Sequence, residues 1–168
     1  MVKKTKNTNN QGALAKKSKM QSLEFQTSFG LRQMGAEEIF HQYAKAELEY
    51  IASLGLTDDI MGIKRLIDGV GNSLDAFVTA YCGDLISSCV CVALGISRIG
   101  GIHNLIMPQK TWAELIDQKL ISIYFSDDKR NKVVAWAKEH GFNTSTYLGQ
   151  PIIKFDKIFL LIKRCVKN

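Results

Sequence analysis

Proline, cysteine and long apolar runs are all scarce in this chain, and each shortage excludes a class of protein. Only Pro108 and Pro151 interrupt its 168 residues, which is not typical of a low-complexity or linker-like chain. The most apolar stretch, residues 76–96, contains Asp84 and several Ser, Thr and Gly residues. A helix that spans a bilayer needs roughly 20 predominantly apolar residues. We therefore expect a folded globular protein that has no membrane partner.

The four cysteines are too few and too irregularly placed for a disulfide scaffold. Residues 1–10 are polar throughout and lack the apolar core of a secretory signal. Disulfides are rare in the reducing cytoplasm. We therefore expect a cytoplasmic protein with reduced, buried thiols at Cys82, Cys89, Cys91 and Cys165.

Metal-ligand spacing is also lacking. Glu38 and His41 form the E-x-x-H pair of di-iron helical bundles, but neither of the other two histidines has a glutamate three residues before it. Cys89 and Cys91 would point about 160° apart on a helix, so they cannot share one ion there. The sequence therefore predicts no metal and no cofactor.

No catalytic motif is present either. The chain has no G-x-S-x-G, no H-E-x-x-H and no glycine-rich phosphate loop. The carboxylate doublets Asp58-Asp59 and Asp127-Asp128 fall at the expected starts of helices, where carboxylates stabilise the first turn. We therefore expect a protein that is not an enzyme, although an active site assembled from distant residues would leave no local pattern.

Charge is distributed unevenly along the chain. Residues 1–20 hold six lysines and no acidic residue, whereas residues 21–100 hold five basic and ten acidic side chains. Residues 101–168 hold eleven basic and six acidic side chains. This asymmetry indicates either an anionic partner for the C-terminal half or self-association between acidic and basic halves. Solvated charges that are spread unevenly without any function would give the same pattern.

The N-terminal half of the chain is predicted to be helical behind a tail. Residues 1–20 have almost nothing to bury, so they are expected to form a disordered basic tail ahead of a single domain at 21–168. Apolar residues at three-four spacing predict helices over 36–54, 57–70 and 74–94. The last of these is expected to be central, with Phe77, Tyr81, Leu85 and Cys89 buried on one face.

The C-terminal half mixes strand and helix signals. Ile102–Met107 and Ile121–Phe125 favour strands, and the capping box that Thr111 forms with Glu114 opens a short helix. A second helix is predicted from Asp127 to His140, with an outward side of Arg130, Lys132 and Lys138. Thr144–Leu148 and Ile152–Ile162 then predict a hairpin. The fold class is therefore α+β, with an N-terminal helical unit packed on a small antiparallel sheet and one or two further helices.

This element order allows two interpretations of the C-terminal half. It matches the later part of a winged helix-turn-helix, in which the 127–140 helix would enter the major groove of DNA. If Ile121–Phe125 is a strand, the region becomes a general α+β cap and the groove-reading geometry disappears.

The function expected from these features is non-catalytic nucleic-acid binding or nucleoprotein assembly, because lysine and arginine neutralise phosphates. An oligomeric adaptor, which joins acidic and basic halves of its copies or holds an acidic protein, is the alternative. The predicted nucleic-acid-binding residues are the lysines of the tail and the basic residues of the C-terminal half: Lys3, Lys4, Lys6, Lys16, Lys17, Lys19, Arg130, Lys132, Lys138, Lys154, Lys157, Lys163 and Arg164.

Overall fold

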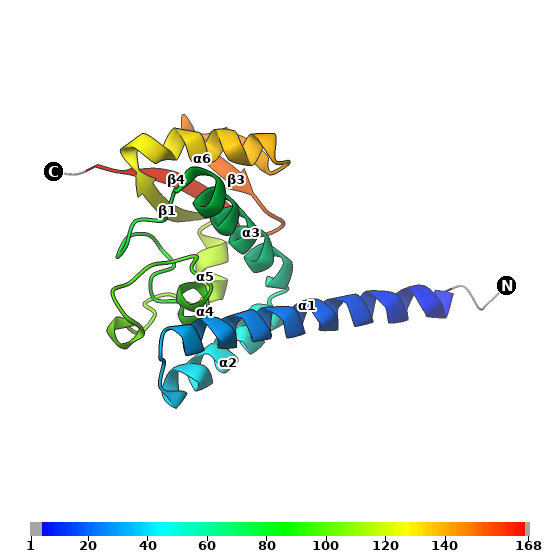
Figure 1. Ribbon diagram of the computed structural model, residues 1–168. Helices are drawn as coiled ribbons and strands as arrows, with labels where there is room; N and C mark the ends of the chain where they lie inside the picture. The colour runs from blue at the N-terminus through cyan, green and yellow to red at the C-terminus, as the bar shows by residue number, and fades with distance from the viewer. Residues whose placement is uncertain (1–4, 167–168) are drawn as a thin grey trace.

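The chain folds into a helical N-terminal unit and a four-stranded sheet that share one hydrophobic core (Figure 1). The computed structural model describes residues 5–166, with side-chain surroundings given from residue 10 onward. Its elements are α1 (Thr5–Gln33), α2 (Glu38–Ser53), α3 (Thr57–Leu74), α4 (Cys89–Ala93), a 3-10 turn (Ile102–Asn104), α5 (Trp112–Asp117), β1 (Leu120–Ser126), α6 (Asp127–Glu139), β2 (Asn143–Tyr147), β3 (Gln150–Lys154) and β4 (Phe159–Cys165). The predicted α+β class is confirmed.

The sheet is mixed rather than wholly antiparallel. Its strand order is β1-β4-β3-β2, and β1 pairs with β4 in parallel while the other pairs are antiparallel. Side chains alternate along β1, so Ile121, Ile123 and Phe125 are buried on one face. Val133 and Ala137 of α6 are also fully buried, and α6 lies across that face of the sheet (Figure 1). Helix α6 therefore does not cover the opposite face of the sheet.

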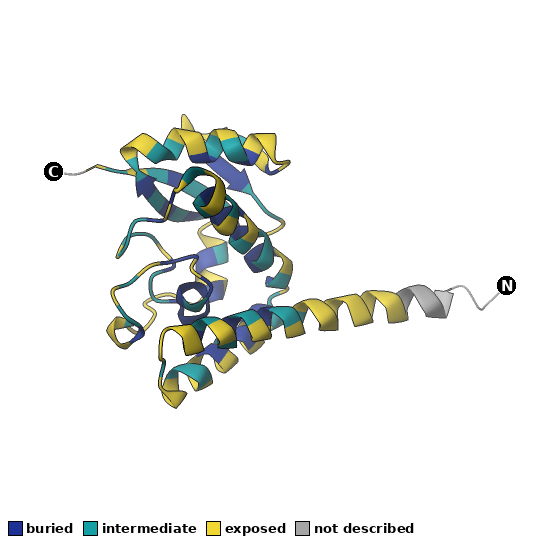
Figure 2. Cartoon of the chain, viewed as in Figure 1, coloured by how far each residue is buried: buried dark blue, intermediate teal, exposed yellow. Residues whose placement is uncertain are grey.

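Helix α1 differs from the expected tail. The structure continues this helix back to Thr5, so residues 5–20 form its first half, and residues 1–4 lie outside the described residues. Leu23, Thr27 and Leu31 anchor the second half in the core, whereas residues 10–19 are exposed (Figure 2). Extending an existing helix costs far less than nucleating a new one, and the alanines and lysines of this segment favour helix.

The predicted 74–94 helix is wrong. Helix α3 instead runs on to Leu74, residues 75–88 are irregular, and only residues 89–93 are helical. The irregular segment lies along the outer edge of β1, where the amide of Thr79 donates to the carbonyl of Tyr124 and the amide of Asp84 donates to the carbonyl of Ser122. Covering a free strand edge satisfies backbone groups that a helix would have left unpaired. We call residues 75–88 the edge strap.

The edge strap changes which side chains are buried. Leu85 and Cys89 are buried as expected, but 53% of the surface of Phe77 and 58% of that of Tyr81 are exposed. Tyr81 and Gly83 have positive φ angles of 62° and 96°. A helix cannot contain such residues, so the apolar spacing misled the prediction at this point.

Several elements predicted from local sequence signals are present in the structure. The α2 and α6 helices begin and end close to the predicted residues, and the capping box between Thr111 and Glu114 is present. The hairpin is confirmed in part, because β2 and β3 pair. Its turn lies at Leu148 and Gly149, both with positive φ, ahead of the expected residues 149–151, and the strand predicted over 152–162 is divided into β3 and β4. Ile102–Met107 is not a strand, since only a 3-10 turn forms at residues 102–104.

The winged-helix interpretation is not supported by this topology. Residues 120–126 form a full strand, so the C-terminal half has the order β-α-β-β-β. The 74–94 helix, which would have been the first helix of the winged unit, is replaced by the edge strap and the short α4. Between residues 5 and 166, no helix combines the length and hydrophobicity that crossing a bilayer demands.

Candidate nucleic-acid interface

The basic residues predicted for the N-terminus lie on or before the projecting half of α1. Lys16 and Lys17 are exposed there, and the ammonium of Lys19 lies 3.0 Å from a carboxylate oxygen of Asp58 on α3. Lys3 and Lys4 lie outside the described residues, as does the side chain of Lys6. The exposed half of α1 therefore presents solvated lysines along a helix and not a concave binding site.

The three basic residues predicted to share the outward side of α6 do not do so. Arg130 and Lys132 are two positions apart, which places them about 160° apart around the helix. Lys132 and Lys138 are exposed, but Arg130 is half-buried beside Arg164 of β4. Burial lowers the pKa of the Arg130 guanidinium, and the charge of Arg164 lowers it further. The prediction of one basic recognition face on α6 is therefore wrong.

Two other predicted residues are engaged within the protein. Lys157 donates from its ammonium to the carbonyl oxygen of Leu54 at 2.9 Å, where it binds the C-terminal end of α2. The guanidinium of Arg164 lies 3.5 Å from Asp127 and donates to the amide oxygen of Asn131 at 3.4 Å. Both side chains therefore have structural partners that a phosphate would have to displace.

Lys154 and Lys163 are brought together on the sheet face that α6 does not cover, which we call the open face. The register pairs Tyr124 with Lys163 and Lys154 with Phe159, and paired residues project to the same side. Alternation places the following strand residues on this face: Leu120, Ser122, Tyr124, Ser126, Phe159, Leu161, Lys163, Cys165, Gln150, Ile152, Lys154, Asn143, Ser145 and Tyr147. Among the strand residues that the structure describes, none on this face is acidic.

Each of the two lysines lies against an aromatic ring. The ammonium of Lys163 is 5.6 Å from the centre of the Tyr124 ring, and that of Lys154 is 5.8 Å from the centre of the Phe159 ring. Both distances fall within the range of a cation–π interaction. The open face thus presents two pairs of a flat ring and a cation on adjacent strands.

The rings and lysines of the open face are accessible to solvent, whereas Ile152 between Leu161 and Ser145 is only 3% exposed. Tyr124, Phe159 and Leu161 are half-buried and take no part in the hydrophobic core on the other side of the sheet. A third aromatic side chain, Tyr147 at the end of β2, exposes 51% of its surface. An apolar and cationic surface of this kind can bind an anionic polymer that carries flat rings, because the rings stack on the aromatic side chains and the lysines attract the anionic groups.

Sequence reasoning found the two lysines but missed the rings. The alternation of Phe159, Leu161 and Lys163 along β4 is a sequence signal that places them on one face. Tyr124 joins them only through the parallel pairing of β1 with β4, which joins residues 39 positions apart in the chain and leaves no local pattern.

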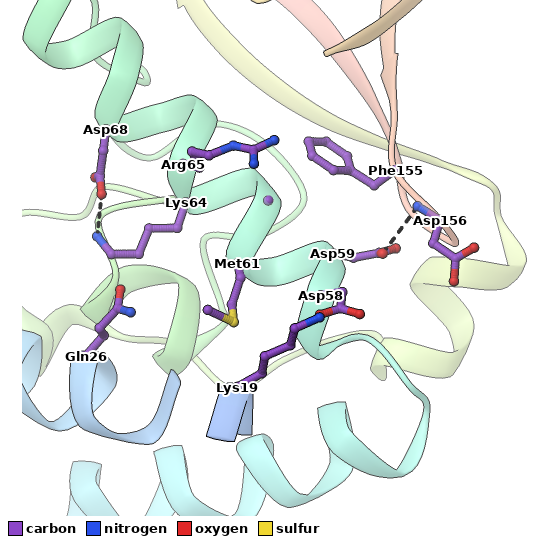
Figure 3. A pocket seen from close by; sticks show the side chains of 11 residues that line it. Lys19, Gln26, Asp58, Asp59, Met61, Lys64, Arg65, Asp68, Phe155 and Asp156 are labelled. Atoms are coloured by element: carbon purple, nitrogen blue, oxygen red, sulfur yellow. Dashed lines mark hydrogen bonds and ion pairs between the residues drawn. The ribbon is translucent and has the colours of Figure 1, made fainter. Parts of the chain in front are cut away.

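A groove between α1 and α3 contains about 660 Å³ of free space (Figure 3). Four of its charged side chains form ion pairs, since Lys19 pairs with Asp58 and Lys64 pairs with Asp68 at 2.8 Å (Figure 3). Asp59, only 2% exposed, accepts hydrogen bonds from the backbone amides of residues 156, 157 and 158. The Lys19–Asp58 pair joins α1 to α3, and the Asp59 hydrogen bonds join α3 to the turn between β3 and β4, so both have a structural role.

The remaining candidate chemistry has structural explanations. Glu47 accepts hydrogen bonds from the Ser88 hydroxyl, the Val90 amide and the Trp112 indole, so it joins α2 to α4 and α5. All four cysteines are free thiols. Within the described part of the chain, no three His, Cys, Asp or Glu side chains gather closely enough to hold a metal ion.

Comparison with known proteins adds no assignment to this geometry. The sequence matches no protein-family model and no curated protein.

Proposed function

We propose that the protein is a non-catalytic nucleic-acid-binding protein and that the open face is its main contact surface. The observation that carries this proposal is the pairing of Lys154 with Phe159 and of Lys163 with Tyr124 on a face whose described strand residues include no carboxylate. Among the described strand residues of this face, none carries a negative charge that would repel a phosphate from the two ammonium groups.

The lysines of α1 add a second, weaker electrostatic contribution. Lys16 and Lys17 project from the body on an exposed helix, so they raise the local concentration of any polyanion without defining its position. Affinity that comes from phosphate neutralisation depends on salt, because each contact releases bound counterions. The open face positions the strand, while α1 increases the rate of encounter.

A salt series on matched lysine variants tests this assignment. Binding of a random oligonucleotide should weaken linearly on a log–log plot against salt concentration. We expect Lys154→Gln with Lys163→Gln to flatten this slope by about two phosphate contacts, which is about 1.4–1.8 slope units. The control pair, Lys132→Gln with Lys138→Gln on α6, should change the slope less. The reverse order, with the larger loss in the α6 pair, would contradict the placement on the open face.

Self-association is a second candidate function, and an exposed stripe on α2 favours it. Ile39, Tyr43 and Tyr50 lie along one side of α2, away from the buried Leu48, and all three are exposed. Glu38 and Glu49 border this stripe. Its occupant would be the projecting half of α1 from a second copy.

Charge and length support that occupant. Leu14 is exposed on the projecting half of α1 and is followed by Lys16 and Lys17, opposite in sign to Glu38 and Glu49. Residues 5–19 span about 22 Å as a helix and α2 spans about 24 Å, so the two can lie side by side.

Charge reversal and restoration test the self-association. Sedimentation should show a mass that rises with protein concentration and falls with salt. The double change Lys16→Glu with Lys17→Glu should abolish the dimer, and adding Glu49→Lys should partly restore it. Glu47 is unsuitable for this purpose because it is occupied by Ser88, Val90 and Trp112. A monomer at every concentration would exclude the second function and leave the first intact.

A further inference from the structure

We infer that the open face binds single-stranded nucleic acid, with unpaired bases stacked on the Tyr124 and Phe159 rings, in preference to a duplex. This inference rests on the proposed function and specifies its ligand. It starts from the side chains on that face, where rings rather than hydrogen-bonding groups lie beside the lysines. Every base has an apolar flat face, so stacking on a ring requires no particular sequence.

The spacing of the rings indicates more than one base. Tyr124 pairs with Lys163 on β4, and Phe159 lies four residues earlier on the same strand. At about 3.3 Å per residue along a strand and about 4.8 Å between strands, the two rings are roughly 14 Å apart. One base cannot cover both rings, so two separate bases of one strand would occupy them. Tyr147 on β2 is opposite Gln150, four residues along β3 from Lys154, and offers a third exposed ring at that end of the sheet.

The lysines lie where the backbone of such a strand would run. Each ammonium lies over its ring in the free protein, at 5.6 Å for Lys163 and 5.8 Å for Lys154, so a base that stacks on the ring moves the ammonium toward the rim. A base stacked on the ring carries its phosphate to the rim of that ring, within reach of the same ammonium. Stacking and phosphate neutralisation therefore act on one nucleotide at a time.

A duplex fits this surface poorly. Paired bases bury their flat faces in the helical stack, so they cannot reach the rings. The outer strands of a four-stranded sheet are about 14 Å apart, wider than the roughly 12 Å major groove. The exposed helix α6 lies on the opposite side of the sheet and carries Asp128 and Glu139 among its exposed residues, which would repel phosphate in a groove. Only an unpaired strand can use the rings and the lysines together.

Competing single-stranded and duplex oligonucleotides test the inference in the full-length protein. Fluorescence anisotropy would measure the affinity for mixed-sequence 15-mers as single-stranded RNA, single-stranded DNA and duplex DNA at one low salt concentration. We expect the single strands to bind more tightly than the duplex. Tyr124→Leu and Phe159→Leu should each weaken single-strand binding by about 5- to 150-fold, the range that corresponds to about 1–3 kcal/mol per stacked base.

Conservative and distant variants serve as controls. Phe159→Tyr and Tyr124→Phe keep a ring and should retain single-strand affinity. Phe25→Leu removes an exposed ring from the anchored half of α1, which belongs to neither proposed contact surface, and should leave the affinity unchanged. If a leucine variant loses thermal stability, the comparison of single strand with duplex in the intact protein decides the question by itself.

The outcomes separate this inference from the proposed function. Equal affinity for duplex and single strand, or leucine variants that bind like the intact protein while Lys154→Gln with Lys163→Gln weakens binding, would overturn the stacking model and leave nucleic-acid binding standing. No binding of any oligonucleotide at low salt would overturn both.

Discussion

At the scale of single residues, the buried thiol of Cys89 makes stability depend on pH. Burial, with a smaller contribution from the charge of Glu47, raises the pKa of this thiol from 9.0 to about 12. Between these two values the unfolded chain loses a proton that the folded chain keeps, so stability present below about pH 9 is lost as the pH rises toward the higher value. Urea unfolding should show a loss of at most about 1.4 kcal/mol per pH unit from this thiol. Cys89→Ala should have a shallower alkaline slope, and an unchanged slope would contradict its burial in the folded state.

Two glycines of α1 give a matched test of packing. A methyl group added at Gly30 would clash with the carbonyl oxygen of Ala93 on α4, whereas at Gly12 nothing lies within 4 Å. Gly30→Ala should therefore destabilise the fold by about 1–3 kcal/mol, the usual cost of overpacking. Gly12→Ala should leave the unfolding midpoint unchanged and increase the helix content slightly. Equal effects of the two substitutions in denaturant unfolding would show that α1 does not pack on α4.

The neighbouring carboxylates Asp58 and Asp59 differ in burial and in their hydrogen-bond and ion-pair partners. Asp59 is buried and accepts hydrogen bonds from three backbone amides of the turn between β3 and β4. Asp58 is exposed, and its one described ion pair is with Lys19. Asp59→Asn replaces an acceptor oxygen by a donor facing those amides, which should cost about 2–3 kcal/mol. Asp58→Asn should cost less than about 1 kcal/mol, as is usual for an exposed ion pair. Chemical unfolding of the two variants makes the comparison, and an equal loss would show that the turn does not depend on Asp59.

At the scale of secondary-structure elements, the two halves of α1 should differ in stability. Its second half is anchored through Leu23 and Leu31, while residues 10–18 are exposed on all sides. Isolated helices of this length are marginal in water, so the amides of 10–18 should exchange with solvent much faster than those of 23–31. Deletion of residues 1–18 should leave the melting temperature nearly unchanged and weaken polyanion binding. Strong protection of residues 10–18 in a monomeric sample would contradict this division.

The edge strap shows why a helical pattern can fail at this scale. Its apolar residues recur at three-four spacing, yet the segment can instead cover the free edge of β1. Leu85 is buried in the strap, as it was expected to be in a helix. The carboxylate of Asp84 accepts a hydrogen bond from the amide of Ser122, and an isolated helix could not make this contact. Propensity is a weak local preference of at most about 1 kcal/mol per ordinary residue, so several edge hydrogen bonds can outweigh it.

At the scale of the whole molecule, the single domain expected from the sequence can be tested with the two tryptophans. Trp112 is joined to α2 through Glu47, and Trp136 lies on α6 against the ring of Phe142. One continuous core links these regions, so the chain should unfold in a single cooperative transition. The variants Trp112→Phe and Trp136→Phe should each show one fluorescence midpoint that coincides with its own circular dichroism midpoint. Separate midpoints would indicate two folding units.

Interactions within a few residues made much of the fold predictable from the sequence. The capping box at Thr111 depends only on neighbouring residues, and the hairpin of β2 and β3 was also expected, although its turn lies at Leu148 and Gly149 rather than at 149–151. Local signals also predicted α2 and α6, whose apolar stripes and end signals set their bounds within a residue or two. These elements form the α+β architecture that composition and periodicity predicted.

Only the tertiary structure decided which surfaces face solvent. Periodicity could not show that Arg130 would turn toward Arg164, or that residues 75–88 would cover β1. The open face depends on the parallel pairing of β1 with β4, which places Tyr124 beside Lys163 across an intervening helix and hairpin. Such pairing is set by which strands can bury Ile123 and Ile162 together against α6. The physical reason is that a contact between distant residues depends on the packing of the whole core, and neither residue carries a local sign of it.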